Sequence, residues 1–333
     1  MKRKIKIGQL GMGHNHGAAK METVRKFPEL FEVVGIAEPN EKWLRQRGAL
    51  PAYAGLPVLD AGELLATPGL DAVLVETDVP ELLKAAQMCI DAGKHIHLDK
   101  PAGQDIAAYA RLLSDAEAGH LTVQLGYMYR YNPAVQYCLA KVKDGTLGEL
   151  FAVDAVMSTE HPAEYRRWLR NFQGGTLYIF GCHLIDLVLS LWGMPESITA
   201  YQKKTFFDSV DVYDNGFAVL NYRQGVATVR ASSVEVNGFG RRQLVVCGSK
   251  GSIEIKPLER PTVLCLTLKD YSSPYCDKKK IIPLPETAGR YDEMMLDFAK
   301  MVRGERKNPY SSAYELTLQK AILKACGFSE IDL

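Results

Sequence analysis

Short apolar runs alternate with segments of helical spacing over the first third of the chain, and this alternation restricts the fold more than any other feature of the sequence. Strands that are separated by helices are joined by right-handed crossovers, so they form a parallel sheet with helices on both faces. We therefore predict an open, doubly wound α/β domain of the Rossmann type over residues 1–127. The predicted strands cover residues 5–10, 31–37, 72–76, 95–99 and 122–127, and the predicted helices cover residues 16–26, 43–47, 59–66, 82–92 and 106–119.

A different pattern begins near residue 128, where strand-like runs follow one another with little helix between them. This arrangement favours an antiparallel sheet. Residues 128–333 are therefore predicted to form an α+β domain with a mainly antiparallel sheet. Its predicted helices cover residues 133–144, 176–192, 292–303 and 312–326, and its predicted strands cover residues 150–157, 217–222, 227–236, 243–247, 252–255 and 263–268.

The composition narrows the range of partners. The chain has 40 Lys and Arg against 39 Asp and Glu, and a net charge of +1 creates no field that attracts nucleic acid or an anionic membrane. No window approaches the roughly 18 apolar residues that a membrane helix needs. The seven cysteines are scattered singly, which favours a reducing compartment. We expect a cytoplasmic protein that takes small ligands and binds neither nucleic acid nor membrane.

A glycine-rich turn, Gly11-Met12-Gly13, follows the first predicted strand and opens the first predicted helix. Glycines permit a tight turn there and let backbone amides approach a pyrophosphate at the helix N-terminus, which is typical of a dinucleotide cradle. The third glycine of the usual G-x-G-x-x-G pattern is replaced by His16, with Gly17 one residue later. By itself the motif is equally consistent with a plain strand-to-helix turn.

Glu38 ends the second predicted strand, about twenty residues past the glycine turn. An acidic side chain at this place accepts hydrogen bonds from the adenosine ribose hydroxyls and repels a 2′-phosphate, so the sequence predicts NAD rather than NADP. The nearby Lys42, Arg45 and Arg47 keep NADP open as the alternative. The alternative role of Glu38 is that of a solvated carboxylate at a strand end.

His14 and His16 lie in the same turn and raise the question of a metal ion. Two ligands do not make a site, and the sequence reveals no third one. No metal is therefore predicted, and we expect polar histidines beside the phosphates.

Lys100 stands where the fourth long strand of the predicted parallel sheet ends, on the edge at which such sheets bind their ligands. Pro101 disfavours helical geometry at Lys100 and keeps the chain extended there. A lysine near a nicotinamide can orient a substrate hydroxyl and take part in proton transfer. Without further context, a surface lysine at a strand end explains the residue better.

Several motifs together resemble the glucose-fructose oxidoreductase and inositol dehydrogenase family (Gfo/Idh/MocA). Residues 93–101, Gly-Lys-His-Ile-His-Leu-Asp-Lys-Pro, resemble its A-G-K-H-V-x-x-E-K-P signature. Residues 130–133 resemble its R-x-N-P segment, and residues 145–148 resemble its G-x-L-G turn. Residues 174–186 resemble its G-G-x-x-x-D-x-G-x-H-x-x-D helix, and residues 248–252 its G-T-K-G-S hairpin. Each motif is weak alone, but their order and spacing along most of the chain are specific.

The resemblance implies a Rossmann domain and, over residues 128–333, a substrate-binding domain whose open sheet often mediates oligomers, here a homodimer or homotetramer. It implies hydride transfer between nicotinamide and a secondary hydroxyl or ketone of a sugar, cyclitol or related polyol. Lys100 would then orient the reacting hydroxyl, and His183 would act as general acid and base, a role that suits an imidazole near neutral pH. The predicted cofactor-binding residues are Gly11, Met12, Gly13, His14, Asn15, Glu38, Thr77, Asp99 and Lys100.

The chain departs from the family pattern at Ile179, where the family has an aspartate one helical turn before the histidine. Asp186 does not replace it, because the family has an aspartate there as well. Asp99 in place of the family's glutamate is a smaller change beside Lys100. The loss at Ile179 leaves cofactor binding expected and puts sugar dehydrogenation in doubt.

Substrate contacts are predicted at His161, Arg167 and Trp168, and more weakly at Tyr178, because the family's pocket is often lined in this stretch. A tryptophan offers its face to sugar C–H bonds, and an arginine offers donors to an anionic or carbonyl group. The alternative is a solvated arm used in subunit contacts.

Two other functions remain open beside the dehydrogenase. The first is a dinucleotide-binding sensor that keeps the scaffold and has lost turnover, which the loss of the family aspartate at Ile179 motivates. The second is a lyase or glycosidase in which oxidation is a transient step that regenerates bound NAD.

Overall fold

The computed structural model describes residues 3–269, 279–286 and 289–333. The chain divides into two compact units, each of which is described by itself. The first unit comprises Met1–Met128 and Thr287–Leu316, and the second comprises Tyr129–Glu286 and Thr317–Leu333. Within the described residues, no helix combines the length and the apolar character that crossing a membrane requires.

The first unit contains a six-stranded sheet in which every pair of neighbouring strands is parallel, in the order β3-β2-β1-β4-β5-β6. The predicted doubly wound parallel sheet is confirmed. Almost every residue of the central strands is buried, as expected when helices cover both faces of a sheet. The strands are β1 (Ile5–Leu10), β2 (Phe31–Ala37), β3 (Val58–Leu59), β4 (Ala72–Val75), β5 (His95–Leu98) and β6 (Val123–Leu125).

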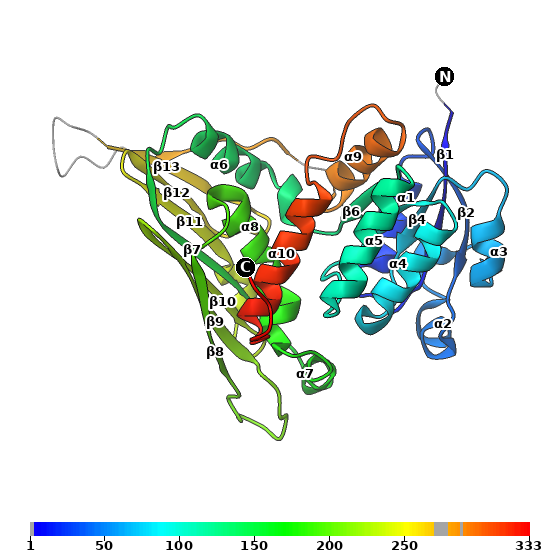
Figure 1. The fold of residues 1–333 in the computed structure, drawn as a ribbon, viewed down its shortest axis with the longest axis horizontal. Helices are drawn as coiled ribbons and strands as arrows, with labels where there is room; N and C mark the ends of the chain where they lie inside the picture. Colours follow the sequence, from blue (N-terminus) through cyan, green and yellow to red (C-terminus); the bar gives the residue numbers. More distant parts are fainter. Residues whose placement is uncertain (1–2, 270–278, 287–288) are drawn as a thin grey trace. The chain divides into compact units, whose positions relative to one another are not determined.

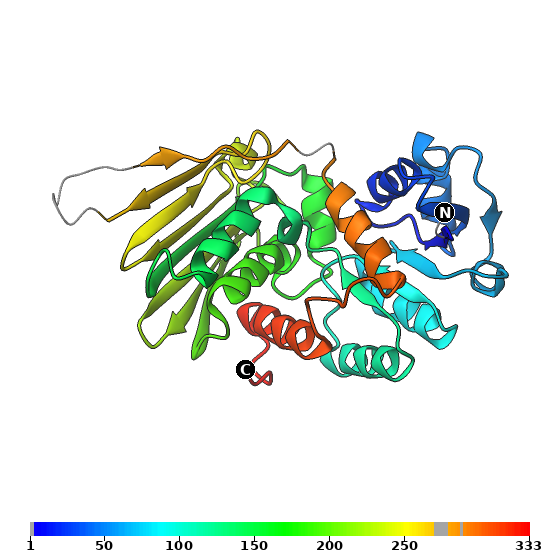
Figure 2. The ribbon, with the colours of Figure 1, turned by 90° about the horizontal axis from the view of Figure 1, so that it is seen from above.

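Helices lie on both faces of this sheet, with α1 and α9 over one face and α4 and α5 over the other (Figure 2). Polar side chains fix several helix starts: Asn40 caps α2, Asp60 forms a capping box with Glu63, and Asp105 caps α5. The helices are α1 (Gly17–Arg25), α2 (Glu41–Arg47), η1 (Pro51–Tyr53), α3 (Ala61–Ala66), η2 (Val79–Glu81), α4 (Leu82–Asp91), α5 (Ile106–Ala118) and α9 (Asp292–Val302).

One strand of the first unit was not predicted. The strand β3 pairs with the end of β2 and overlaps the predicted helix over residues 59–66 at Leu59, and the observed helix starts at Ala61. Two residues are too few to show a strand period. Asp60, which caps the helix, marks the true boundary.

The second unit contains an eight-stranded sheet in the order β14-β13-β12-β11-β7-β10-β9-β8. Only the central pair β7 and β10 is parallel, so the predicted mainly antiparallel sheet is confirmed. The strands are β7 (Leu150–Ser158), β8 (Ser197–Lys203), β9 (Asn215–Tyr222), β10 (Gly225–Ser232), β11 (Gln243–Gly248), β12 (Gly251–Ile255), β13 (Leu264–Leu268) and β14 (Lys280–Ile281).

Helices α6 and α8 pack on one face of this sheet, and its other face is open (Figure 1). The open face carries Tyr201, which is 57% exposed, beside Phe217 of the neighbouring strand. The alternating burial along β9 and β10 reflects this one-sided cover. The helices are η3 (Met128–Tyr131), α6 (Pro133–Lys143), α7 (Ala163–Leu169), the π-helical turn η4 (Leu177–Gly181), α8 (Cys182–Trp192), η5 (Gly238–Arg241) and α10 (Ser312–Ala325).

Candidate functional site

The turn between β1 and α1 leaves no space for side chains at its glycines. Gly11 has a φ of +95°, which favours glycine, and a Cβ there would lie 2.3 Å from the amide nitrogen of Thr77. A Cβ on Gly13 would lie 2.6 Å from the amide nitrogen of Asp78 and 2.9 Å from the ring of Trp43. Both glycines are therefore required for the turn to lie against the loop that follows β4.

Glu38 follows β2 and faces this turn. Its Oε2 accepts the backbone N–H of Met12, and its Oε1 accepts the backbone N–H of Asn40 at 2.8 Å. The side chain is buried, and this burial raises its pKa. A carboxylate that accepts two hydrogen bonds keeps lone pairs for a further donor, such as a hydroxyl. Lys42 and Arg45, the nearby cations, are exposed on α2.

A pocket of about 600 Å³ adjoins Glu38 and the glycine turn. Its lining includes Leu10, Glu38, Trp43, Thr77 and Asp78. The hydroxyl of Thr77 is buried and has no hydrogen-bond partner among the described residues. The pocket thus lies at the carboxyl ends of β1, β2 and β4, the edge at which doubly wound sheets bind ligands.

Arg47, the last residue of α2, holds the turn from outside. Its Nη1 donates to the carbonyl oxygens of Met12 at 2.8 Å and His14 at 2.7 Å, and its Nη2 donates to Oδ1 of Asn15 at 2.8 Å. Its guanidinium lies 4.6 Å from the ring centroid of Trp43. Arg47 therefore stabilises the shape of the turn and places a positive charge beside it.

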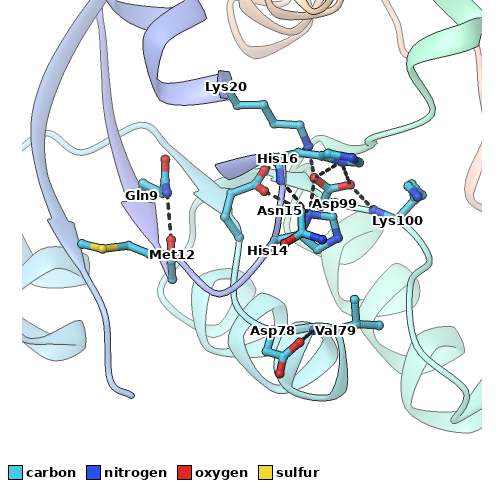
Figure 3. A network of polar contacts seen from close by, with 12 residues as sticks. Gln9, Met12, His14, Asn15, His16, Lys20, Asp78, Val79, Asp99 and Lys100 are labelled. Carbon is cyan, nitrogen blue, oxygen red and sulfur yellow. Dashed lines mark hydrogen bonds and ion pairs between the residues drawn. The ribbon is translucent and has the colours of Figure 1, made fainter. Parts of the chain in front are cut away.

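The structure brings His14 and His16 to Asp99, a neighbour that the sequence did not reveal because 83 residues separate it from His16. The Nδ1 atoms of His14 and His16 lie 3.0 and 3.2 Å from Asp99 Oδ2 (Figure 3). Burial lowers the pKa of both imidazoles, that of His16 to about 3. Both rings are therefore neutral at physiological pH, and each donates one N–H.

Lys20 and Glu76 complete this cluster, and the sequence analysis missed both. Lys20 Nζ forms an ion pair with Asp99 Oδ2 and lies 3.0 Å from Glu76 Oε1, and all three side chains are fully buried. Helical spacing is the one sequence signal that could have identified Lys20 as buried. Lys20 falls three residues after Gly17 and four before Val24, on the buried stripe of α1.

Lys100 is the second residue after β5 and is buried. Its backbone N–H donates to Asp99 Oδ1 at 2.7 Å, so the carboxylate that anchors the cluster also holds the chain at Lys100. The sequence placed Asp99 and Lys100 at one sheet edge, and the structure agrees.

His183 lies in the first turn of α8, in the second unit, and is only 1% exposed. Its ring meets the ring of Tyr129 edge to face at 5.2 Å. Asp186, one turn further, forms a buried ion pair with Arg130 at 2.7 Å. Ile179 is buried in η4, where the family has its aspartate. Asp186 thus has a structural partner of its own.

Two of the residues predicted to contact substrate, His161 and Trp168, lie in a row of aromatic rings in the second unit. The ring of His161 stacks on the rings of Tyr165 and Phe180, with centroid distances of 4.2 and 5.1 Å. The ring centroids of Trp168 and Tyr165 are 5.2 Å apart. Burial lowers the pKa of His161 to about 4.

Arg167 and Tyr178 have opposite environments in this region. Arg167 is exposed, and its neighbour Arg166 is the buried arginine, paired with Asp208. Tyr178 is fully buried and packs 5.6 Å from Phe172. The row therefore joins His161 and Trp168 through Tyr165 and leaves Arg167 outside it.

Solved structures of oxidoreductases share this fold of a parallel-sheet unit and an open-sheet unit. The aldose-aldose oxidoreductase from Caulobacter crescentus complexed with glycerol superposes with a TM-score of 0.82 at 18% identity, covering 97% of this chain and 98% of that chain. The WlbA dehydrogenase from Bordetella pertussis in complex with NADH and UDP-GlcNAcA superposes with a TM-score of 0.80 at 18% identity, covering 98% and 96%. At these identities the likeness establishes the fold.

Sequence comparison matches part of the chain to a known family. Residues 135–254 match the GFO/IDH/MocA C-terminal domain. The chain is 25% identical over 198 residues to the trans-1,2-dihydrobenzene-1,2-diol dehydrogenase of Xenopus tropicalis, a match that covers 58% of this chain and 58% of that enzyme. The chain thus spans little more than half the length of this relative. The match over residues 135–254 confirms the resemblance that the motifs indicated.

Proposed function

We propose that the chain is an NAD-dependent oxidoreductase that moves hydride between nicotinamide and a secondary hydroxyl or ketone of a sugar, cyclitol or related polyol. One observation carries the proposal. The tight glycine turn, the inward-facing Glu38 and the adjoining pocket share the carboxyl edge of a parallel sheet with Lys100. The WlbA neighbour, which has the same fold, is in complex with NADH.

The first unit offers groups that suit each part of the dinucleotide. The turn at Gly11 and Gly13 would face the diphosphate, with the charge of Arg47 beside it. Glu38 would accept hydrogen bonds from the ribose hydroxyls, and the unpartnered hydroxyl of Thr77 would meet a polar group of the ligand. The buried carboxylate of Glu38 favours NAD, because a 2′-phosphate would be repelled there.

The chemistry requires one group that polarises a hydroxyl and one that holds its proton. Bound nicotinamide accepts or returns the hydride. We assign Lys100 to the hydroxyl oxygen, which its ammonium polarises, and His183 to the hydroxyl proton, which its imidazole takes during oxidation and returns during reduction. Each oxidation releases one hydride and one proton from the alcohol.

The second unit would supply substrate contacts and subunit contacts. We assign the stacked rings of His161 and Trp168 to the face of a sugar-like ring, with Arg167 and Tyr178 as further contacts. The open sheet face supports a homodimer or homotetramer. We further propose a cytoplasmic location, in line with the scattered cysteines.

The test uses protein stripped of small molecules. NADH is titrated by nicotinamide fluorescence, and the protein is then incubated with NAD and a panel of sugars, inositols and other polyols while the absorbance of reduced nicotinamide is followed. We expect NADH to bind and at least one polyol to reduce NAD. Lys100→Ala should lose turnover and keep NADH binding. Binding without turnover on the whole panel would contradict the proposal.

The buried Ile179 favours a second candidate, a dinucleotide sensor without turnover. An Ile179→Asp variant separates the two, because it restores the family's carboxylate one turn before His183. Turnover in this variant and none in the native chain would support the sensor. A redox-assisted lyase or glycosidase would change the substrate's mass without net reduction of NAD, so the same incubations are also analysed by mass spectrometry.

A further inference from the structure

Five ionisable side chains meet at the glycine turn, and three of them, Lys20, Glu76 and Asp99, have no exposed surface. Figure 3 shows His14, His16 and Lys20 around Asp99. Lys20 comes from α1, Glu76 directly follows β4, and Asp99 directly follows β5. His14 and His16 reach the same place from the turn. As a result, Asp99 Oδ2 faces three nitrogen atoms, one on an ammonium and two on imidazoles.

This cluster has the ligand types of a metal centre. His14, His16 and Asp99 each offer one ligand atom, and the three atoms lie within 4.8 Å of one another. The ammonium of Lys20, however, contacts the same Asp99 oxygen that would face the metal. A divalent cation and an ammonium at one buried oxygen repel each other strongly, because little water screens them. The charge of Asp99 is therefore balanced from within the chain.

We infer that Lys20 is a positioning residue that acts as the built-in cation of this cluster: it holds Asp99 in the place of a metal ion and, through Asp99, fixes the backbone at Lys100. The surroundings keep Lys20 charged. Burial acts to lower its pKa, but the carboxylates of Asp99 and Glu76 raise it above its usual value. The ring of Tyr291, 5.8 Å from Lys20 Nζ, adds a further favourable contact.

Asp99 transmits this effect because its two oxygens have different partners. Oδ2 faces Lys20, and Oδ1 accepts the backbone N–H of Lys100 at 2.7 Å. A buried carboxylate that loses its counter-ion moves or takes up a proton, and either change weakens the hydrogen bond to Lys100. The catalytic purpose of this positioning rests on the proposed function, but the positioning itself is measured without cofactor or substrate.

The first experiment measures amide hydrogen exchange by NMR in a Lys20→Met variant, which loses the ammonium and keeps an unbranched side chain. Exchange at the Lys100 amide is expected to be at least about tenfold faster, while exchange at Val73 and Ile96, inside β4 and β5, changes less than about twofold. Lys26→Met is the matched control, because Lys26 caps the same helix and pairs with Asp292 nearer the surface. Unchanged exchange at Lys100 in Lys20→Met would overturn the inference.

A double-variant cycle tests whether Lys20 acts through Asp99. Asp99→Asn keeps an oxygen for the Lys100 amide and removes the charge that Lys20 holds. In this background Lys20→Met should change the exchange at Lys100 by less than about twofold. An equal effect in both backgrounds would overturn the inference. If Lys20→Met fails to fold, the variant that also carries Glu76→Gln and Asp99→Asn should fold, because no buried carboxylate then lacks its cation; failure of both would also overturn it.

Cobalt(II) titration tests the comparison with a metal centre. The native chain should show no ligand-field absorption, and Lys20→Ala should bind cobalt at least about tenfold more tightly, since the competing ammonium is gone. Adding His16→Ala to that variant should remove the gain. One equivalent of zinc or iron purified with the native chain, or no gain in Lys20→Ala, would show that Lys20 is not the cation of this cluster.

Discussion

The groups that we assign to the cofactor in the first unit and those that we assign to substrate in the second unit differ in their surroundings. In the first unit, Lys20, Glu76 and Asp99 are completely buried together, beside the sheet edge that we assign to the cofactor. In the second unit, the residues that we assign to substrate are mainly aromatic, and the titratable His161 is held neutral between two rings.

The difference shows that the backbone constrains the groups of the first unit more than those of the second. The first unit positions its groups through a turn that tolerates only glycine and through charges that balance one another, so its geometry is set before any ligand binds. In the second unit, individual side chains and not the backbone determine which ligand is bound. Sequence motifs therefore predict the class of cofactor, but they do not predict the substrate.

Loss of Lys100 or His183 is the largest effect that we predict. Lys100→Ala and His183→Ala should each lower kcat by about 10²- to 10⁴-fold and change the Kd for NADH by less than about threefold, because each group acts on the substrate hydroxyl. Steady-state kinetics on any substrate found in the polyol panel provides the measurement. Lys94→Ala, on the same segment but bonded to the carbonyl oxygen of Leu70, is the control. Full activity in His183→Ala would remove the second unit from catalysis.

Substitution of a glycine in the turn should have the next largest effect, which is on the free energy of unfolding. Gly11→Ala is expected to lower the free energy of unfolding by about 2 to 4 kcal/mol, since its Cβ would overlap the backbone at Thr77 and its φ of +95° is unfavourable for alanine. Gly55→Ala shares a positive φ but has nothing within 4 Å of the added Cβ, so it should cost only about 1 kcal/mol. Urea denaturation measures both. Equal losses of free energy of unfolding in the two variants would show that the contact with Thr77 does not exclude a side chain at Gly11.

Acid should reveal the neutral histidine of the second unit. The pKa of His161 is lowered to about 4 by burial, while the unfolded value is about 6.5, so the unfolded chain binds the extra proton and stability falls as the pH drops between these values. His161→Phe keeps the stacking and cannot titrate. The variant should lose about 1 kcal/mol less of its free energy of unfolding on acidification than the native chain. The effect is no larger because solvent around the half-buried ring screens part of the charge on the imidazolium. Urea denaturation at pH 7 and at lower pH measures the free energy of unfolding of both proteins. The same dependence of this free energy on pH in both proteins would refute the prediction.

The outer support of the turn should give the smallest effect. Arg47→Met removes three hydrogen bonds to the turn and one positive charge, and should weaken NADH binding about fivefold, or about 1 kcal/mol. Arg45→Met is the control, because Arg45 is exposed and pairs only with Glu41, at 3.5 Å. Nicotinamide fluorescence titration compares the two. Equal affinities would mean that the glycine turn keeps its shape without Arg47.

Much of the fold was predictable because its strands are long apolar runs. The strands β1, β2, β4 and β5 were predicted close to their observed bounds for this reason. The strand β8 was missed because it lies at the edge of its sheet, where none of its residues is buried and no apolar pattern marks it. The helix α7 lay in a stretch interpreted as a connection, since seven residues give too few turns for a clear period.

The site was predictable only where local sequence determines it. The glycine turn, Glu38 and Lys100 follow directly from strand ends, so the sequence places them at one sheet edge. The cluster around Asp99 depends on contacts between residues far apart in the chain, and Lys20 looks like any surface lysine until its position on the buried stripe of α1 is known. Spacing within one helix could have identified Lys20, but nothing local identifies its partners.

Isothermal titration calorimetry on protein freed of small molecules tests the central claim most directly, namely that the first unit holds a nicotinamide dinucleotide against the turn after β1. The account predicts one NADH per chain, with NADPH at least about tenfold weaker because the carboxylate of Glu38 faces the ribose. No heat with either dinucleotide, oxidised or reduced, would contradict it.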